Sequence, residues 1–438
     1  MTYFEKWKQK QIISDSVKRY QHFDSPVDLR KVKHCTKVLH EIKNIRSHQF
    51  LPFIKIVKKK IKFTLAKDTG NKVRTVKPRG IMYASHLDSH IYSYYNFILY
   101  SKYEQFLFKK GIEDKVIAYR RVENRTSGKG KSNIDFAKDV FEYIDELGEC
   151  TVVTQDITSF FDNLNHKLLK KYLMDVLRVS FLPDDWQKIF HSLTRYRYVD
   201  HKDDFIKKRL KSKIQKEPNV PIYKHLKGIF KENKKDIGIP QGSPMSGLLA
   251  NIYLAYFDCW INKKYPDVFY RRYSDDILFV CKKTMDMSVF MKEINQKISE
   301  YKIEIQPKKT YVTKFCMIAR ELCVCEVMHG NKIVGRDYLD YLGFEFDGTN
   351  VRFRKSTIQK FNVRERNRIL RKVKQFDPEE NKGKNKITKK NKIGSKISFN
   401  RDEYYNRSIE SFGSISLVSQ RKQMYKNKRK IKRKEKNK

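Results

Sequence analysis

The sequence VFYRRYSDDILFVC, residues 268–281, contains the strongest structural signal in this chain. Two runs of apolar and aromatic residues flank the acid pair Asp275-Asp276, a pattern that predicts a β-hairpin with both acids at its turn. Earlier in the chain, an apolar strand expected at residues 151–155 leads directly into Asp156. If this strand and the hairpin pair in one sheet, the three carboxylates meet at one edge of it.

Carboxylates gathered in this way suit hard divalent cations, because Mg²⁺ prefers oxygen ligands. Phosphoryl transfer between nucleotides uses two such ions about 4 Å apart, so at least two acids must converge at the site. Asp156 and Asp275 meet that requirement only if their strands share a sheet. Taken alone, each acid site fits a solvated turn better than a catalyst, so the surrounding sequence has to decide.

The composition indicates a globular protein that binds a polyanion. The chain has 438 residues, of which 95 are lysine or arginine and 50 are acidic, and its formal charge is +45. Such a charge disfavours compaction unless a polyanion neutralises it, which favours nucleic acid as the partner. An anionic membrane is the weaker alternative, because no run approaches the roughly 18 apolar residues of a spanning helix.

The two ends of the chain and its cysteines complete this picture. The first residues, MTYFEKWKQK, contain no apolar signal region, which predicts a cytoplasmic protein. Seven scattered cysteines show no CxxC spacing, so we expect reduced thiols rather than disulfides or a zinc site. The last 18 residues contain 11 lysines or arginines and one acid. We expect this segment to have no fold of its own and to hold nucleic acid by electrostatic attraction.

Periodic patterns elsewhere predict the remaining elements. A β-branched, basic stretch with a turn signal at residues 68–71 predicts a hairpin over residues 53–76. Apolar residues at helical spacing predict helices at His90–Phe108, Asn133–Leu147, Asn165–Leu177, Leu248–Trp260 and Thr357–Phe376.

Five motifs occur in order along the chain. They are QDITSFFDNLNHKLL (155–169), GIPQGSPMSGLLANIYLAYFD (238–258), YRRYSDDILFV (270–280), QPKKT (306–310) and YLGF (341–344). Together they resemble the successive palm motifs of bacterial reverse transcriptases, the group that contains intron maturases, retron enzymes and antiphage enzymes. The resemblance covers roughly residues 53–376, and five ordered motifs make it specific.

The resemblance implies the catalytic residues. Asp156 would ligate both metal ions, Asp275 would be the other principal ligand, and Asp276 would be a neighbouring, less direct carboxylate. The backbone carbonyl of Ile157 is implied as a further ligand. The implied cofactor is a pair of Mg²⁺ ions, with Mn²⁺ as a substitute.

The resemblance also implies how the nucleotide is selected. Phe161 matches the family's steric gate, whose ring collides with a ribose 2′-hydroxyl and so favours deoxynucleotides over ribonucleotides. Pro240, Gln241 and Gly242 match the loop that packs against the templating pair, where glycine permits close backbone approach and glutamine can hydrogen-bond. A purely structural loop at a helix entry is the alternative.

Other contacts with nucleic acid follow from the same resemblance. Lys72 and Arg74 would contact the incoming triphosphate, with Lys77 or Arg79 as alternatives, and arginine suits bidentate phosphate binding. Lys309 matches a lysine that assists the departure of pyrophosphate, and a surface lysine is the alternative.

Tyr341, Leu342 and Gly343 would belong to the primer grip at the junction of palm and thumb. Tyr273 is interpreted as a packing residue that supports the hairpin.

The implied fold is α+β, a right-hand polymerase with fingers, a palm whose antiparallel sheet carries the catalytic aspartates, a helical thumb and basic extensions. The expected segments are a helical leader (1–50), fingers (51–150), the first part of the palm (151–194), a basic insertion (195–237), the second part of the palm with the primer grip (238–350), a helical thumb (351–376) and a basic, low-complexity extension (377–438).

The implied function is RNA-directed DNA polymerisation, with an RNA template, deoxynucleotides, a DNA product and no membrane. The stretch AYRRVENRTSGKGKSNIDFAKDVFEYI (118–144) resembles defence-associated reverse transcriptases of the "unknown group" class, which implies an antiphage role on a structured noncoding RNA. Three alternatives stay open, namely template-independent or protein-primed DNA synthesis, a maturase-like RNA-binding protein and an RNA polymerase. The sequence leaves the template, the primer and the oligomeric state open.

Overall fold

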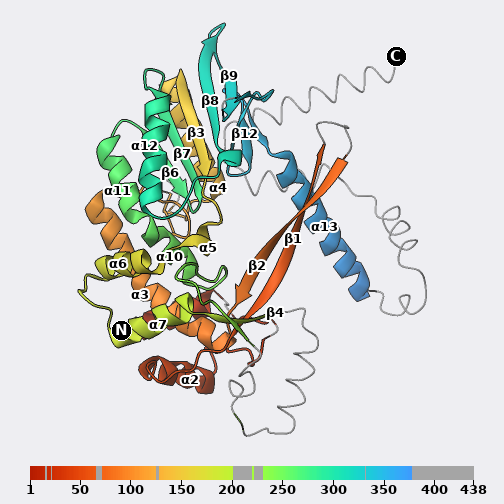
Figure 1. Ribbon diagram of the computed structural model, residues 1–438. Helices are drawn as coiled ribbons and strands as arrows, with labels where there is room; N and C mark the ends of the chain where they lie inside the picture. The colour runs from red at the N-terminus through yellow and green to blue at the C-terminus, as the bar shows by residue number, and fades with distance from the viewer. Residues whose placement is uncertain are drawn as a thin grey trace. The chain divides into compact units, whose positions relative to one another are not determined.

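The computed structural model describes residues 1–14, 17–20, 22–65, 72–124, 128–200, 220, 230–330 and 332–376. The chain divides into two units, each with its own packing. The first unit contains residues 1–121, 155–279 and 285–310, and the second contains residues 122–154, 280–284 and 311 onward. Figure 1 shows the elements with the labels used below.

Helices dominate the first unit, and α3 (His86–Lys110) is the longest helix in the described part of the chain. Ser85 caps its start by accepting a hydrogen bond from the Asp88 amide, and Gly111 ends it in the left-handed conformation. The other helices of this unit are α1 (Tyr3–Ile13), α2 (Val32–Lys43), α5 (Phe160–Asn163), α6 (His166–Leu177), α7 (Asp184–Thr194), α10 (Ser246–Tyr253), α11 (Ala255–Lys264), α12 (Met287–Glu300) and the 3₁₀ helix η1 (Pro307–Lys309).

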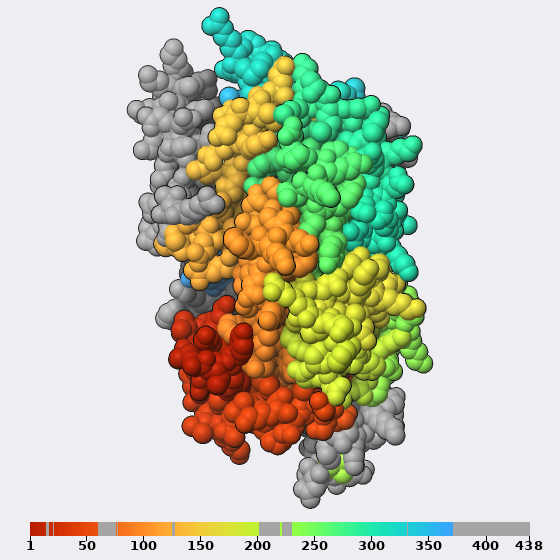
Figure 2. Space-filling view, turned by 90° about the vertical axis from the view of Figure 1, so that its left-hand side faces the viewer, coloured from red at the N-terminus to blue at the C-terminus, as the bar shows by residue number. Residues whose placement is uncertain are grey.

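The N-terminal residues, expected to form a helical leader, contain α1 and α2. Trp7 on α1 is fully buried, and its indole Nε1 donates to Ser93 Oγ on α3 at 3.1 Å. Val27, Leu29 and Val38 complete this small core. Figure 2 shows the red N-terminal residues lying against the orange residues of α3. The N-terminal helices are therefore packed onto the longest helix of the unit.

A four-stranded sheet with the order β2-β1-β4-β5 also belongs to the first unit. β1 (Phe53–Leu65) and β2 (Lys72–Tyr83) form the long antiparallel pair drawn as crossing orange arrows in Figure 1. β4 (Arg197–Asp200) runs parallel to β1, and β5 (Lys231–Glu232) pairs with β4. The expected turn at residues 68–71, and most of the expected basic insertion, lie outside the described residues.

The largest sheet has the strand order β10-β9-β8-β3-β7-β6. Its strands are β3 (Cys150–Asp156), β6 (Phe269–Tyr273), β7 (Asp276–Lys282), β8 (Tyr311–Ile318), β9 (Glu321–His329) and β10 (Lys332–Ile333). In the second unit, β3 pairs antiparallel with β8 from Cys150↔Phe315 to Thr154↔Tyr311, and β8 continues antiparallel into β9. The last residues of β3, together with β6 and the start of β7, belong to the first unit.

The second unit is completed by helix α4 (Asn133–Leu147), a small sheet of β11 (Leu339–Tyr341), β12 (Phe344–Phe346) and β13 (Val351–Phe353), and helix α13 (Lys355–Phe376). Phe346 lies between Phe141 of α4 and Phe315 of β8, with ring centroids at 4.7 and 5.7 Å. These aromatic contacts join α4 and the small sheet to β8 of the larger sheet. The expected basic extension from residue 377 lies outside the described residues.

Two expectations are corrected by the structure. The helix expected over Leu248–Trp260 is two helices, α10 and α11, because the backbone leaves helical geometry at Leu254 (φ −100°, ψ 5°). Cys316 and Cys325, expected to be reduced thiols, form a disulfide between β8 and β9, since strand pairing brings together cysteines whose sequence spacing gave no sign of it. Among the described residues, no helix has the length and apolarity needed to span a membrane.

Candidate active site

Asp156 and Asp275 are brought together where β3 ends beside the turn between β6 and β7. The Ile157 amide donates to the Asp275 carbonyl at 3.1 Å, directly after β3. The turn itself is tight because Ser274 adopts the left-handed conformation (φ 62°). The structure thus produces the pairing of strand and hairpin on which convergence of the two acids depended.

A second segment holds Asp156 from its other side. The Gln306 amide donates to the Asp156 carbonyl at 2.7 Å, and the Thr158 amide donates to the Glu304 carbonyl at 2.9 Å. The chain then enters η1, which ends at Lys309 and places its ammonium on Asp156 Oδ1. Lys309, singled out from a motif far from Asp156 in sequence, therefore contacts the carboxylate directly.

The two carboxylates influence each other electrostatically. Asp275 is half-buried, and its pKa is raised, first by burial and then by the negative charge of Asp156. Asp276 begins β7 and is exposed. A cation held by Asp156 and Asp275 would relieve the repulsion between them.

The two carboxylates of the site are suitable ligands for a divalent cation. Asp156 and Asp275 offer the oxygen donors that Mg²⁺ prefers. In the described part of the chain, no group of three or more His, Cys, Asp or Glu side chains is arranged to hold a metal ion. Ile157 is buried, and the ligand roles predicted for its carbonyl and for Asp276 stay predictions.

A pocket of about 350 Å³ has Phe161, Gln241 and Gly242 in its wall, and another of its lining residues, Tyr119, lies 3.5 Å from Ser274, the residue before Asp275. The loop that carries the latter two is docked on α5, because the Ile239 amide donates to the Phe161 carbonyl at 2.9 Å. Three residues predicted to select the nucleotide thus line one cavity.

Gly242 closely approaches the protein's own backbone at Met82, and its predicted contact with the templating pair stays a prediction. Its φ is +122°, and a Cβ there would lie 2.6 Å from the Met82 carbonyl oxygen. The Met82 amide also donates to the Gln241 carbonyl at 2.8 Å. The loop is therefore fastened to the end of β2, and the neighbouring Pro240 carbonyl accepts from Ser246 Oγ at 2.6 Å.

Tyr119 is a pocket residue that the sequence did not single out. Its ring lies edge-to-face with Phe161, with centroids 6.3 Å apart and planes at 85°. Residue 119 precedes the five ordered motifs and lies in the stretch 118–144, which was noted only for its resemblance to defence-associated enzymes. Its position depends on contacts with segments far away in sequence.

Arg272 was also missed, although it lies two residues before the turn. Its guanidinium is fully buried and pairs with Asp258 of α11, with Nη2 at 2.6 Å from Oδ2. The backbone of Arg272 bonds to the Lys115 carbonyl at 2.8 Å and to the Ile117 amide at 3.0 Å. A charged residue in an apolar strand was the available signal, because such a residue needs a buried partner.

The remaining predicted residues lie elsewhere. Lys72 and Arg74 are on β2, and their side chains are outside the described set. In the second unit, Tyr341 ends β11, and Leu342 (φ 45°) and Gly343 (φ 96°) form the turn into β12. The Gly343 carbonyl accepts from the Arg354 amide at 3.0 Å. The roles predicted for these five residues stay predictions.

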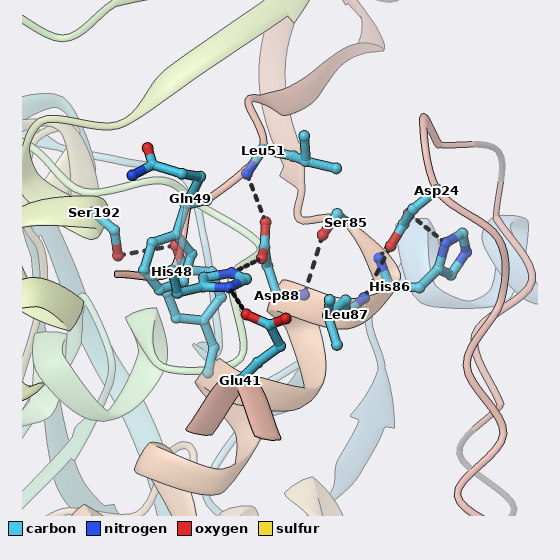
Figure 3. A network of polar contacts seen from close by, with 12 residues as sticks. Asp24, Glu41, His48, Gln49, Leu51, Ser85, His86, Leu87, Asp88 and Ser192 are labelled. Atoms are coloured by element: carbon cyan, nitrogen blue, oxygen red, sulfur yellow. Dashed lines mark hydrogen bonds and ion pairs between the residues drawn. The ribbon is translucent and has the colours of Figure 1, made fainter. Parts of the chain in front are cut away.

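A separate buried network lies at the start of α3 (Figure 3). His48 Nε2 lies 2.7 Å from Asp88 Oδ1, and its Nδ1 lies 2.6 Å from Glu41 Oε2. The other oxygen of Asp88 accepts from the Leu51 amide at 2.9 Å. The network joins α2, α3 and the segment that enters β1.

A family model described as reverse transcriptase (RNA-dependent DNA polymerase) matches residues 100–346, more than half of the chain. The chain belongs to the reverse transcriptase family. The matched domain contains the three predicted aspartates, Phe161, Gln241 and Lys309, as well as Tyr119 and Arg272. Membership of this family of RNA-dependent DNA polymerases was expected from the five motifs and is confirmed; a bacterial origin and the defence-associated class stay predictions.

Solved structures similar to this reverse transcriptase include two telomerases. The apo telomerase from Candida tropicalis, truncated from its C-terminal domain, has a TM-score of 0.36 at 13% identity, over 73% of this chain and 60% of that chain. The telomerase from Candida albicans in complex with a TWJ fragment of telomeric RNA has a TM-score of 0.34 at 14% identity, over 79% of this chain and 55% of that chain. The chain therefore spans less than two thirds of either telomerase chain. No curated protein matches it.

Proposed function

We propose that this chain is an RNA-directed DNA polymerase. The observation that carries the proposal is the contact set around Asp156 inside the matched domain. Ile157 bonds to the backbone of Asp275, and Lys309 pairs with the Asp156 carboxylate. Two acids and a lysine from three separate motifs are thus assembled in one place, and the pocket lined by Phe161 and Gln241 would take the nucleotide.

Asp156 and Asp275 would hold Mg²⁺, which when bound supplies the positive charge that phosphoryl transfer from a nucleoside triphosphate requires. Lys309 would offer its ammonium to the departing pyrophosphate. Phe161 would exclude a ribose 2′-hydroxyl from the pocket, and Gln241 would contact the nucleotide from the opposite loop. The hydrogen bond from the Met82 amide to the Gln241 carbonyl would keep Gln241 in place before substrate arrives.

Primer extension tests the activity directly. Purified protein should extend a DNA primer on an RNA template with deoxynucleotides, and product sequencing should show the complement of the template. Asp275→Asn with Asp276→Asn should abolish extension, while RNA binding measured by gel shift at low salt persists. Binding should weaken steeply as salt rises, because the chain carries a formal charge of +45.

The same assay separates the alternatives. DNA unrelated to the template would indicate template-independent synthesis, and DNA covalently attached to the protein would indicate protein priming. RNA binding without any synthesis, together with cellular function retained in the double aspartate variant, would indicate a maturase-like RNA-binding protein.

Sugar selectivity distinguishes a DNA from an RNA polymerase. The wild type should prefer a deoxynucleotide to the matching ribonucleotide, and Phe161→Ala should reduce that preference. A wild type that prefers ribonucleotides contradicts the proposal of a reverse transcriptase.

For the biological role, we propose antiphage defence in the cytoplasm with a structured noncoding RNA as template. The support is the resemblance of residues 118–144 to defence-associated enzymes. Purifying the chain from cells and sequencing its bound RNA and any attached DNA would identify the template and primer. Phage plating on cells that carry the wild type or the double aspartate variant would test the defence role, and equal plating on both contradicts it.

A further inference from the structure

The backbone of Tyr119 is held in a conformation that tyrosine rarely adopts, with φ at +57°. Both neighbours are anchored. The Ala118 carbonyl accepts from Asn251 Nδ2 at 2.7 Å, and the Arg120 guanidinium binds both carboxylate oxygens of Glu104 at 2.8 and 2.6 Å. Because the flanking residues are fixed on both sides, the surrounding structure imposes this conformation, and such imposed conformations cluster at functional sites.

The ring of Tyr119 is seated on a glycine. A Cβ on Gly247 would lie 2.6 Å from both Cγ and Cδ1 of the ring, so no side chain could occupy that place without moving it. The hydroxyl lies 3.5 Å from Ser274 Oγ, next to Asp275. The residue is nevertheless 51% exposed and lines the pocket. The Tyr119 ring is thus held by Gly247 against one part of the ring and by Ser274 at its hydroxyl. The remainder of the ring is open to the pocket.

The third contact of the ring is with Phe161. The edge-to-face arrangement, with centroids 6.3 Å apart, is a favourable geometry for two aromatic rings. An aromatic gate excludes a 2′-hydroxyl only if its ring cannot move aside when the hydroxyl arrives. Phe161 is half-buried in the short helix α5, and Tyr119 occupies space beside its ring.

We propose that Tyr119 is a specificity-determining residue whose fixed ring supports Phe161 and thereby sets discrimination against ribonucleotides. The inference rests on the proposed polymerase function. It assigns Tyr119 a role in selecting the sugar and none in the chemical step. Gly247 contributes by leaving room for the ring.

Tyr119→Gly is the direct test, because glycine accepts the positive φ and the substitution removes the ring without backbone strain. The measurement is kcat/KM for a deoxynucleotide and for the matching ribonucleotide, and their ratio is the discrimination. We expect the ratio to fall about tenfold or more in Tyr119→Gly, and to remain near the wild-type value in Tyr119→Phe, which keeps the ring. A ratio unchanged in Tyr119→Gly overturns the inference, even if both rates fall together.

Gly247→Ala tests whether the Tyr119 ring needs the space that Gly247 leaves for it. It should lower the discrimination severalfold in the otherwise wild-type protein, because the new Cβ would displace the Tyr119 ring, and much less in the Tyr119→Gly background, where no ring is present to be displaced. Equal losses in the two backgrounds show that the ring is not seated on Gly247 and overturn the inference. Circular dichroism confirms that each variant is folded, and Tyr119→Leu, which keeps bulk but no ring, replaces Tyr119→Gly if the latter does not fold.

Tyr3→Ala is the matched control, because Tyr3 is 53% exposed and lies on α1 away from the pocket. It should leave the discrimination unchanged. Failure of the inference is distinct from failure of the proposed function. A wild type that synthesises no DNA refutes the function, whereas a discriminating wild type with an unchanged ratio in Tyr119→Gly refutes only the role of Tyr119.

Discussion

Arg272 Nη2 lies 2.6 Å from Asp258 Oδ2, and neither side chain is exposed to solvent. Burial would lower the pKa of Arg272, but the charge and hydrogen bonds of Asp258 raise it above its usual value, so Arg272 stays protonated. Arg272 Nη1 also donates to the Ser274 carbonyl at 3.3 Å. The turn that presents Asp275 is therefore tied to α11 through a buried ion pair.

Asp258→Asn should destabilise the protein strongly, because it leaves the Arg272 guanidinium buried without a counter-charge. Removing one partner of a buried pair costs about 3–5 kcal/mol of unfolding free energy. Urea denaturation measures this loss. Arg352→Met is the control, since its partner Asp347 is 2.8 Å away but Arg352 is 55% exposed, and such surface pairs contribute at most about 1 kcal/mol. Equal effects of the two substitutions contradict the structural role of the buried pair.

Lys309→Gln should lower both the Mg²⁺ concentration needed for activity and the turnover. The ammonium lies on Asp156 Oδ1, so its removal should lower the Mg²⁺ concentration that gives half-maximal activity. Turnover at saturating Mg²⁺ should fall about a hundredfold, as when one charge-stabilising donor is removed from an active site. Titrating extension activity with Mg²⁺ measures both.

Lys308→Gln, one residue earlier on η1 and exposed, is the control for Lys309 and should behave as the wild type. If Lys309→Gln gives the same Mg²⁺ titration and turnover as Lys308→Gln, the lysine is a surface residue without a role in the reaction.

Gly242→Ala should damage the loop that carries Gln241. The new Cβ would lie 2.6 Å from the Met82 carbonyl oxygen at a φ of +122°, and such strain costs about 1–3 kcal/mol. We expect at least a roughly tenfold loss of kcat/KM for the nucleotide, because misplacement of positioning groups is costly to rate. Gly335→Ala, where a Cβ meets nothing within 4 Å, is the matched control. Wild-type kinetics in Gly242→Ala would show that the loop tolerates separation from β2.

The His48 network predicts a pH dependence of stability. Burial lowers the pKa of His48, but Asp88 and Glu41 outweigh it, and the net shift is upward. Protonated His48 therefore contributes stability that is fully present below the unfolded pKa of about 6.5 and is lost as pH rises through the folded value. The unfolding free energy of the wild type should decrease from pH 6 toward pH 8, with a smaller decrease in His48→Gln.

His90 and Lys18 also titrate near this pH range, so the effect of His48 has to be taken from the difference between the wild type and His48→Gln. Burial lowers the pKa of His90 to about 4 and that of Lys18 to about 8. Because both proteins contain His90 and Lys18, their contributions cancel when the slopes of the wild type and His48→Gln are subtracted. Exposed His191→Gln should leave the slope unchanged. Parallel stability curves for the wild type and His48→Gln contradict the role of His48.

Local patterns in the sequence were sufficient for several elements. The helix expected at Asn165–Leu177 is α6 with Asn165 as its cap, because its side chain accepts from the Leu168 amide at 3.2 Å. The helix expected at Asn133–Leu147 has those bounds. The hairpin around Asp275 follows from apolar runs on both sides of a polar turn. In each case the signal lies within a few residues of the element that it specifies.

Tertiary structure decided the remaining features. The support of Phe161 by Tyr119, the seat of that ring on Gly247 and the pairing of Arg272 with Asp258 join residues that no local pattern connects. The disulfide between Cys316 and Cys325 depends on the pairing of β8 with β9. Periodicity and motif order record which residues are helical, extended or chemically capable, since these properties arise between neighbours in the chain. Which side chain rests against which is settled only when strands pair and helices pack, because that contact is made across the fold.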